Sequence, residues 1–338
     1  MYDRQAIEGF FRDFSGKGIL VIGDVMIDAY LWGGVDRISP EAPVPIVSLH
    51  RRENRLGGAA NVALNLRNLG ARPILCSVTG EDDKGRLFLD LLQQQGLEAG
   101  GMLTDAERIT TVKYRIIGNN TQMLRVDEES RQALTDAMTG KLLERIKALI
   151  GHHRVHAIVF EDYDKGVIGP ALIREVVALA RARDIPVAVD PKKNNFLLYR
   201  DVSLFKPNQK ELREGLKLDG DLSDPREVGR AAGMLHEQLE ADVILATLSD
   251  KGIFYSRRDG QGQEEGIVGG RARDIADVSG AGDTVISVAA LSMACRLPVR
   301  LMAELCNLAG GIVCEQVGVV PVDRKRLQEE AIRYLSGS

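Results

Sequence analysis

Short apolar runs alternate with segments of helical periodicity along this chain of 338 residues. Residues 18–23 (GILVIG) are typical of a buried strand, and residues 58–70 carry apolar side chains at helical spacing before a glycine stop. The same alternation continues in six later segments: 71–80, 85–96, 141–150, 155–160, 170–184 and 185–190. It predicts an α/β fold, in which a mostly parallel central sheet has helices on both faces. Because α/β enzymes of this length often form one folding unit, we expect residues 1–338 to be a single domain.

Two segments interrupt the alternation. Residues 29–50 contain three prolines between strand-like ends, and residues 109–127 predict a hairpin with the turn GNNT. They are either ordinary surface hairpins or a small β lid over a site, and in parallel α/β sheets such a site lies at the carboxyl ends of the strands. A further stretch, 259–270, is rich in glycine and polar residues and predicts a loop.

Composition excludes several classes of protein. The 44 basic and 48 acidic residues give a net charge of −4, so there is no excess of positive charge to hold a nucleic-acid backbone. No apolar run reaches the ~18–20 residues that span a bilayer, and the N-terminus lacks the apolar core of a signal peptide. The four cysteines show no CxxC spacing and the five histidines no zinc pattern. We therefore expect a cytoplasmic protein with reduced thiols, no membrane insertion and no nucleic-acid partner.

The strongest local signal is a turn of small residues, Ser279-Gly280-Ala281-Gly282, that leads into an apolar helix. The first turn of such a helix exposes unpaired backbone N–H groups, and the helix dipole favours an anion there. Asp283 stands at the start of this helix, where a carboxylate suits the removal of a proton from a hydroxyl that attacks the anion. The alternative is that Asp283 only caps the helix.

Two nucleotide-binding patterns fail on this sequence. Gly280 and Gly282 match G-x-G, but the third glycine of a dinucleotide fingerprint would fall at Val285, and no βαβ unit follows. The chain also has no G-x-x-x-x-G-K-[ST] motif, which excludes a Walker-type nucleoside triphosphatase. The broken dinucleotide fingerprint disfavours a nucleotide-dependent dehydrogenase.

Two clusters near the N-terminus suit a sugar. Gly57 and Gly58 permit close approach of a ligand at a helix start, and Asn61 offers hydroxyls both a donor and an acceptor; helix packing is the alternative. Asp24 and Asp28 follow the first strand and suit polyol hydroxyls, whereas a metal site would need a third ligand that the neighbourhood lacks.

A third cluster suits a metal ion. Asn208 and Glu211 lie three residues apart on the first turn of a predicted helix, and therefore on one face. They could hold a hydrated Mg²⁺ near phosphates. Equally, they could form a capping box that only closes the end of the helix.

Taken together, these motifs resemble the PfkB (ribokinase-like) family of sugar kinases. The family's N-terminal signature matches at six positions: Gly57, Gly58, Asn61, Ala63, Gly70 and Gly80. Its C-terminal signature matches over 277–283, and its N-x-x-E element matches at Asn208 and Glu211, in the family's order. The resemblance covers nearly the whole chain. It implies a three-layer ribokinase-like fold with a small β lid formed by about 29–50 and 109–127.

A narrower likeness lies within this family. Five segments resemble the kinases that phosphorylate D-glycero-β-D-manno-heptose 7-phosphate for ADP-heptose synthesis: 23–33, 37–47, 55–65, 124–127 and 162–166. The likeness implies ATP-dependent phosphorylation of the anomeric (C1) hydroxyl, a step toward the lipopolysaccharide core. Another sugar or sugar phosphate is the alternative substrate. Relatives of this kind often carry a nucleotidyltransferase domain with an HxGH-type motif; no such motif occurs here, so we expect no nucleotidyltransferase domain.

Four positions depart from the pattern of these relatives. Glu161 replaces a small residue, Leu248 an arginine, Gln316 a lysine and Val319 a threonine. The last three concern the nucleotide side of the site more than the sugar. A silent sugar-binding relative would lack Asp283 or the N-x-x-E pair, and all of these are present.

The resemblance also implies a role for each site residue. Asp283 would take the proton from the C1 hydroxyl, and Gly280, Ala281 and Gly282 would stabilise charge on the transferred group. Asn208 and Glu211 would organise Mg²⁺ through water. The nucleotide would border Ser249, Asp250, Gly252 and Asn307. The sugar phosphate would contact Asp24, Asp28, Gly57, Gly58, Asn61 and Asp162, and its phosphate would need cations from among Lys113, Arg115, Arg125, Lys165 and Lys192. For any one of these five, solvated surface charge is the alternative.

The expected partners are therefore ATP, Mg²⁺ and a sugar phosphate, with a requirement for a monovalent cation (K⁺) left open. Lids of related kinases often pair across a dimer, and Trp32, Val44 and Ile46 could supply an apolar lid face. We therefore expect a homodimer through the lid.

Overall fold

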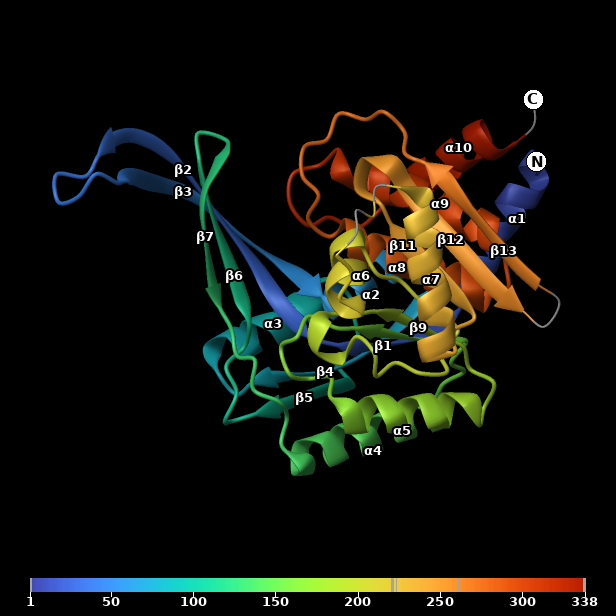
Figure 1. Cartoon of the computed structure of the whole chain (residues 1–338). Coiled ribbons are helices and arrows are strands. Elements are labelled where there is room, and N and C mark those ends of the chain that lie inside the picture. The colour runs from blue at the N-terminus through green and yellow to red at the C-terminus, as the bar shows by residue number, and fades with distance from the viewer. Residues whose placement is uncertain (1, 220–221, 223, 260–261, 337–338) are drawn as a thin grey trace.

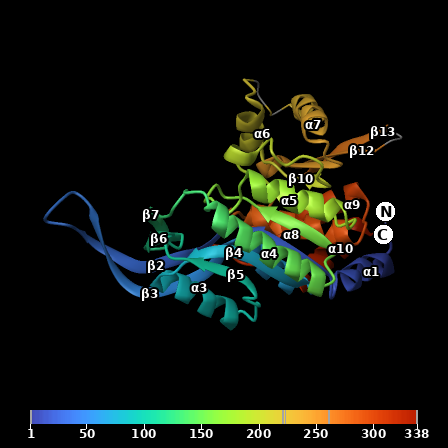
Figure 2. The same cartoon turned by 90° about the horizontal axis from the view of Figure 1, so that it is seen from below.

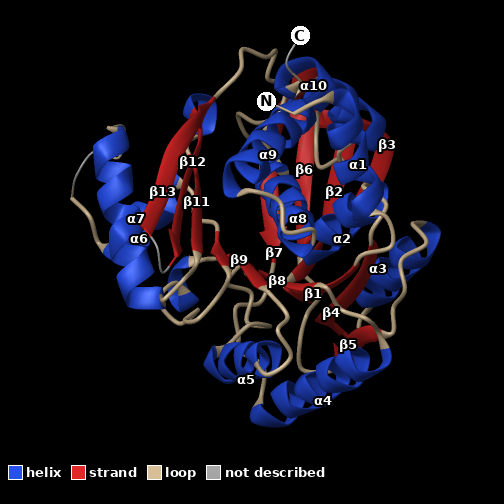
Figure 3. Ribbon diagram, turned by 90° about the vertical axis from the view of Figure 1, so that its right-hand side faces the viewer, coloured by secondary structure: helices blue, strands red, loops and turns tan. Residues whose placement is uncertain are grey.

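A nine-stranded sheet forms the centre of the computed structural model, which describes residues 2–219, 222, 224–259 and 262–336 (Figures 1 and 3). Its parallel part has the order β11-β10-β9-β8-β1-β4-β5, and an antiparallel pair, β12 and β13, extends the β11 edge. The strands are β1 (Gly18–Gly23), β4 (Arg72–Gly80), β5 (Gly101–Asp105), β8 (Ala157–Glu161), β9 (Val187–Asp190), β10 (Leu204–Phe205), β11 (Val243–Thr247), β12 (Gly252–Asp259) and β13 (Gly262–Gly269). The predicted mostly parallel sheet is confirmed.

Alternate side chains of the strands build two cores, one on each face of the sheet. In β1, Ile19 and Val21 face one core and Leu20 and Ile22 face the other, and all four are fully buried. The first core is covered by α1 (Arg4–Phe14), α2 (Ala59–Asn68), α3 (Asp83–Gln94), α8 (Ala281–Ala294), α9 (Val299–Cys314) and α10 (Arg324–Leu335). The second is covered by α4 (Asp136–His152), α5 (Pro170–Arg181), α6 (Gln209–Leu216) and α7 (Pro225–Leu239). Among the described residues, every helix is too short or too polar to bridge a lipid bilayer.

The two segments that interrupt the alternation form one projecting sheet, which we call the lid (Figures 1 and 2). Its order is β3-β2-β6-β7, with β2 (Val25–Ile38), β3 (Pro45–Gly58), β6 (Val112–Gly118) and β7 (Thr121–Glu128). The predicted GNNT turn is confirmed: Asn119 and Asn120 both have positive φ, 49° and 63°, as a tight hairpin turn requires. The strands extend beyond the predicted limits, because β2 begins at Val25 and β3 ends only at Gly58.

The prediction of a loop over 259–270 is wrong. Strand β13 occupies Gly262–Gly269 and pairs along its whole length with β12, from Gly252↔Gly269 to Asp259↔Gly262; residues 260–261 lie outside the described residues. The glycines lower the strand propensity of this segment, but the ladder of hydrogen bonds to β12 outweighs that preference. The structure of this segment is therefore decided by its pairing with β12, which its own composition does not reveal.

Candidate active site

Asp283 lies in the first turn of α8 and is 3% exposed. Its Oδ2 accepts a hydrogen bond from Nδ2 of Asn61 on α2 (2.7 Å), and its Oδ1 accepts one from the hydroxyl of Tyr163, just beyond β8 (2.7 Å). The N-cap of α8 is Gly280, and the first turn has no side-chain cap. The structure therefore contradicts the alternative that Asp283 only caps the helix.

Burial raises the pKa of Asp283 to about 6. The hydrogen bonds from Asn61 and Tyr163 lower this pKa, and the carboxylates of Asp190 and Asp28 raise it. A carboxylate with a pKa near 6 is ionised at neutral pH and is a stronger base than an ordinary aspartate. Asp283 is thus suited to take a proton from a hydroxyl.

Backbone N–H groups that are suited to an anion adjoin this carboxylate. Gly280 has φ +77°, and a Cβ there would lie 2.9 Å from Nδ2 of Asn61, so a residue with a side chain would be strained and would crowd the site. Within the described part of the chain, the backbone N–H groups of Gly282 and Asp283 have no hydrogen-bond acceptor. They point out of the helix N-terminus, where the dipole favours negative charge. The N–H group of Ala281 is not free for the role expected of it, because it donates to the carbonyl of Val278 (3.3 Å). Anion binding at this turn stays a prediction.

A buried cation lies beside this turn. The Lys206 ammonium pairs with Oδ2 of Asp190 (2.9 Å), and both groups lie within 3.7 Å of the place where a Cβ on Gly282 would stand. Burial acts to lower the pKa of Lys206, but the charges of Asp190 and Glu211 raise it above its usual value. Lys206 therefore stays charged beneath the anion site.

A cavity of about 650 Å³ opens from the anion site toward β12 and α9. Its lining includes Ala281 and Gly282 and all four residues predicted to border a nucleotide: Ser249, Asp250, Gly252 and Asn307. The Asn307 amide donates to the carbonyl of Gly269 (2.9 Å). The volume is in the range of small-molecule sites, and the structure brings these four residues together as predicted.

Asn208 and Glu211 form the capping box of α6. The Asn208 Oδ1 accepts the Glu211 backbone N–H, and Glu211 Oε2 accepts the Asn208 backbone N–H, both at 2.9 Å. Glu211 Oε1 pairs with the Lys192 ammonium (2.6 Å), which also lies 3.5 Å from Oδ1 of Asp190. Among the described residues, no group of three histidine, cysteine or acidic side chains could hold a metal ion directly. The oxygens of Asn208 and Glu211 keep further lone pairs, so the pair is suited to a hydrated Mg²⁺ held through its waters. Mg²⁺ binding here stays a prediction.

The residues predicted to contact the sugar have different surroundings. Asp28 is buried, pairs with Arg115 of β6, and lies so close to Gly57 that a side chain at 57 would collide with it. Gly58 has φ +61° and turns the chain from β3 into α2.

Asp24 has a different environment. Its two carboxylate oxygens accept the backbone N–H groups of Tyr163 (2.9 Å), Lys165 (3.0 Å) and Val167 (3.0 Å). Burial raises the pKa of Asp24 to about 6. Asp24 thus holds the turn after β8 in place.

Asp162, which was also predicted to contact the sugar phosphate, stabilises the same turn. Its carboxylate accepts the Asp164 backbone N–H (2.9 Å), the Asn195 amide (2.9 Å) and the Tyr199 hydroxyl (2.7 Å). Through these bonds Asp162 links the turn after β8 to Asn195 and Tyr199.

The five predicted phosphate-binding cations are not equivalent. The half-buried Lys113 ammonium lies 5.2 Å from the ring centroid of Tyr163. Lys165 is buried and pairs with Glu129 (2.5 Å). Arg125 is exposed on β7 and pairs with Asp127 (2.9 Å). Arg115 and Lys192 also have acidic partners, so Lys113 is the cation of this set that has no ion pair within the described residues.

Sequence reasoning missed four residues of the site: Tyr163, Glu161, Asp190 and Lys206. Tyr163 belongs to the segment 162–166, of which only Asp162 and Lys165 were predicted to be site residues. Glu161, Asp190 and Lys206 stand at or just after the carboxyl ends of β8, β9 and β10, which is the signal that could have found them. Both carboxyl oxygens of Glu161 are buried and have no hydrogen-bond partner in the part of the chain that the structure describes. Burial, and then the charges of Asp190 and Asp283, raise the pKa of Glu161 well above its usual value.

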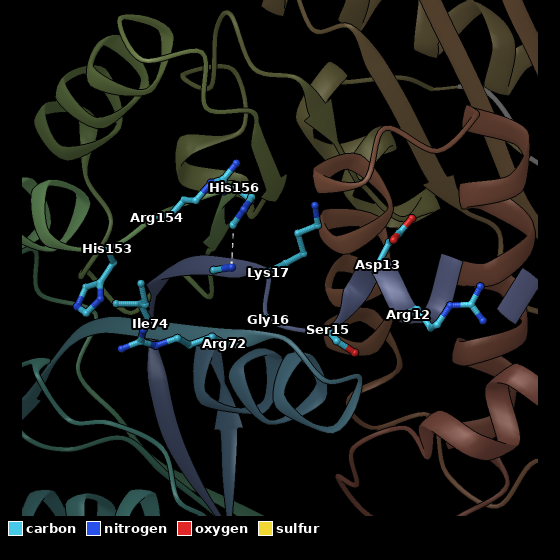
Figure 4. A pocket seen from close by; sticks show the side chains of 11 residues that line it. Arg12, Asp13, Ser15, Gly16, Lys17, Arg72, Ile74, His153, Arg154 and His156 are labelled. Carbon is cyan, nitrogen blue, oxygen red and sulfur yellow. Dashed lines mark hydrogen bonds between the residues drawn. The ribbon is translucent and has the colours of Figure 1, made fainter. Parts of the chain in front are cut away.

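A second hollow, of about 440 Å³, lies near the amino ends of β1 and β4 (Figure 4). Arg12, Lys17, Arg72 and Arg154 border it, but three of these are exposed, and its one carboxylate, Asp13, is exposed as well. None of the described residues that line this hollow is a buried carboxylate. The groups suited to proton transfer therefore lie at the carboxyl ends of the strands, beside Asp283.

Transfer of a phosphoryl group to an alcohol needs a base for the hydroxyl and hydrogen-bond donors for the phosphate. Asp283 and the backbone N–H groups at the start of α8 are suited to these roles, beside a cavity of about 650 Å³. The site therefore suits a phosphotransferase that acts on an alcohol. Residues 17–325 match the pfkB family of carbohydrate kinases, and the chain belongs to this family. It is a carbohydrate kinase, and kinases of this family use ATP.

Several known proteins are similar to this chain. The bifunctional protein HldE of Koribacter versatilis (strain Ellin345) is 41% identical over 319 residues, which cover 94% of this chain and 63% of the relative. HldE of Pelobacter propionicus is 38% identical over 95% of this chain and 64% of the relative. The chain thus spans less than two thirds of the length of these curated relatives.

Solved structures support the fold. Phosphofructokinase-2 from Escherichia coli in complex with potassium superposes with a TM-score of 0.76 at 18% identity, over 95% of this chain and 99% of that one. Arabidopsis thaliana ribokinase, complexed with ribose and ATP, superposes with a TM-score of 0.70 at 16% identity, over 93% and 98%. The ribokinase-like fold class is confirmed.

Proposed function

We propose that this kinase transfers the γ-phosphoryl group of ATP to the anomeric hydroxyl of D-glycero-β-D-manno-heptose 7-phosphate, giving the 1,7-bisphosphate for ADP-heptose synthesis. The observation that carries the proposed chemistry is the buried Asp283 beside the unpartnered N–H groups of α8. The sugar is supported by the five heptose-kinase-like segments and by the HldE relatives. The proposal concerns the kinase reaction alone, with residues 1–338 as one kinase domain.

In the proposed reaction, Asp283 accepts the proton of the C1 hydroxyl as the C1 oxygen bonds to the γ-phosphorus. The bond between that phosphorus and the β–γ bridging oxygen breaks, and ADP leaves. The N–H groups of Gly282 and Asp283 and the Lys206 ammonium stabilise the charge on the transferred group. A hydrated Mg²⁺ near Asn208 and Glu211 would neutralise phosphate charge when bound, and a requirement for K⁺ stays a prediction.

The lid supplies the phosphate end of the proposed sugar site. Lys113 and Arg115 are on β6 of the lid, and Lys192 follows β9 in the body. In this proposal a phosphosugar bridges the two parts, so that lid closure excludes water from the transfer. Asp28 and Asn61 would contact the sugar hydroxyls.

The proposed setting is a cytoplasmic homodimer. Apolar side chains are exposed along the lid, including Ile38 (61%), Leu124 (57%) and Val44 (52%). Exposed apolar side chains are typical of interaction surfaces, and we propose that a second copy covers those of the lid. The four cysteines are free, which suits a reducing compartment with ATP.

A panel of sugars tests the proposed substrate. We expect kcat/KM for the phosphorylated heptose to exceed that for ribose, fructose or adenosine by at least ~10³, because these lack a phosphate for the cationic groups of the lid. ADP release measures turnover, and ³¹P NMR of the product identifies the hydroxyl that is modified. Preference for an unphosphorylated sugar would support the alternative, a PfkB kinase with a different substrate.

Lys113→Met tests the phosphate end of the site. We expect KM for the phosphosugar to rise ~10-fold or more, with KM for ATP nearly unchanged, because one charge-assisted contact is lost. Lys113 is a cleaner choice than Arg115, whose removal would leave Asp28 buried without its cation. Lys84→Met is the matched control, since Lys84 pairs with Glu128 at the lid outside the proposed site. Equal changes in both KM values would argue against phosphate binding by Lys113.

A further inference from the structure

The side chain of Tyr163 occupies an unusual position between the lid and the base. Its hydroxyl donates to Oδ1 of Asp283 (2.7 Å), and its backbone N–H donates to Asp24 (2.9 Å). Two ammonium groups lie 5.2 Å from its ring centroid: Lys113 from β6 of the lid and Lys192 from the loop after β9. Tyr163 is thus the one side chain, within the described residues, that contacts the base, a lid cation and a body cation together.

We propose that Tyr163 is a positioning residue that orients the carboxylate of Asp283 and links this orientation to the placement of the lid. The inference rests on the proposed function for its kinetic test, and on the contacts above for its geometry.

The first step concerns the hydrogen bond itself. Burial raises the pKa of Tyr163 well above its usual value, so the phenol stays protonated and acts as a donor to the carboxylate. A carboxylate oxygen has two acceptor positions, so Oδ1 can accept from Tyr163 and still receive the proton of a substrate hydroxyl. With Asn61 holding Oδ2, the two donors fix the plane of the carboxylate.

The second step concerns the lid. A cation over an aromatic face is attracted by the ring, more strongly where water is excluded. Lys113 belongs to the lid and Lys192 to the body, and Lys192 is further held by Glu211 (2.6 Å). The ring orientation, and with it the direction of the hydroxyl, therefore depends on where the lid places Lys113.

The surroundings of Asp283 make the effect of Tyr163 separable. The hydrogen-bond donors to its carboxylate are Tyr163 and Asn61, and the charged or titratable neighbours are Asp190, Asp28 and Glu161. Asp190 is itself paired with Lys206 and Asp28 with Arg115. Removal of the phenol hydroxyl takes away one stabilising bond to the ionised carboxylate, so the pKa of Asp283 rises.

Tyr163→Phe tests the inference. In the pH profile of kcat/KM with the heptose 7-phosphate, we expect the acidic limb to move up by about one pH unit. We expect kcat at neutral pH to fall ~10-fold while KM for ATP is unchanged. Tyr199→Phe is the matched control: it removes an equally short bond from a buried tyrosine to an aspartate, Asp162, which does not contact the base. Its acidic limb should stay in place.

A second measurement needs no substrate. The ¹³Cγ resonance of Asp283 reports its ionisation directly, and its midpoint should rise in Tyr163→Phe and stay constant in Tyr199→Phe. If wild-type protein phosphorylates no heptose, the proposed substrate fails while this titration still decides the role of Tyr163. An unchanged midpoint in Tyr163→Phe, or equal shifts in both variants, would overturn the inference.

Should Tyr163→Phe fail to fold, site-specific replacement of Tyr163 by a fluorinated tyrosine keeps the ring and its hydroxyl. A more acidic phenol is a stronger donor, so the midpoint of Asp283 should move to lower pH. A midpoint that does not move, or that moves up, would contradict the inference.

Discussion

Asp283→Asn is expected to lower kcat by a factor of ~10²–10⁴ and to leave sugar affinity nearly unchanged. Asparagine keeps the size of the side chain but cannot accept the proton of the attacking hydroxyl. The anion site of α8 and Lys206 remain in this variant, so charge stabilisation persists and residual turnover is expected. Steady-state kinetics, with sugar binding measured separately by calorimetry, separates the two effects.

The pH dependence gives this prediction a second readout. Because the base must be ionised and the pKa of Asp283 is about 6, activity of the wild-type enzyme should fall as pH drops through 6. This limb should disappear in Asp283→Asn. Asp13→Asn, which changes an exposed carboxylate near the amino ends of β1 and β4, is the control. Near-normal turnover in Asp283→Asn would refute the assignment of the base.

Local sequence patterns were sufficient to predict the strands and helices of the α/β body. The strand at 18–23 matches β1 residue for residue, and the helix predicted from 170 begins at Pro170. These elements bury apolar side chains in a regular period, which a single sequence displays. Strand β13 was missed because its stability comes from pairing with β12, a contact that composition cannot show.

The site residues also divide into those that a local pattern reveals and those that only long-range contacts bring together. Asp283 and the turn before it were found because glycines and an acid at a helix start form a local pattern. The capping box of Asn208 and Glu211 was foreseen as an alternative, and the structure shows it formed. Nothing local to Lys206 or Asp190 shows that they pair, because strand order in the sheet brings β9 and β10 together. The oxygens of Asp24 hold a turn some 140 residues away in the sequence, a role that no local pattern shows, and its contact with the sugar stays a prediction.

Loss of the ion pair between Lys206 and Asp190 is expected to cause a large loss of stability. Lys206 is 2% exposed and Asp190 3%, and Oδ1 of Asp190 has no hydrogen-bond partner among the described residues. Lys206→Met is expected to lower the free energy of unfolding by about 3–5 kcal/mol, because it leaves a buried carboxylate with only the more distant Lys192 (3.5 Å). Urea denaturation followed by circular dichroism measures the loss.

A matched pair of variants identifies the cause. The double variant Lys206→Met/Asp190→Asn removes both charges, so it should be more stable than Lys206→Met alone despite carrying one more change. Lys210→Met alters a lysine four positions away that is 80% exposed, and its stability should stay within about 0.5 kcal/mol of wild type. If Lys206→Met were as stable as Lys210→Met, the buried carboxylate would not depend on this cation. Since Lys206 also lies beneath the anion site, the double variant should recover stability but not turnover, which separates its structural role from its catalytic one.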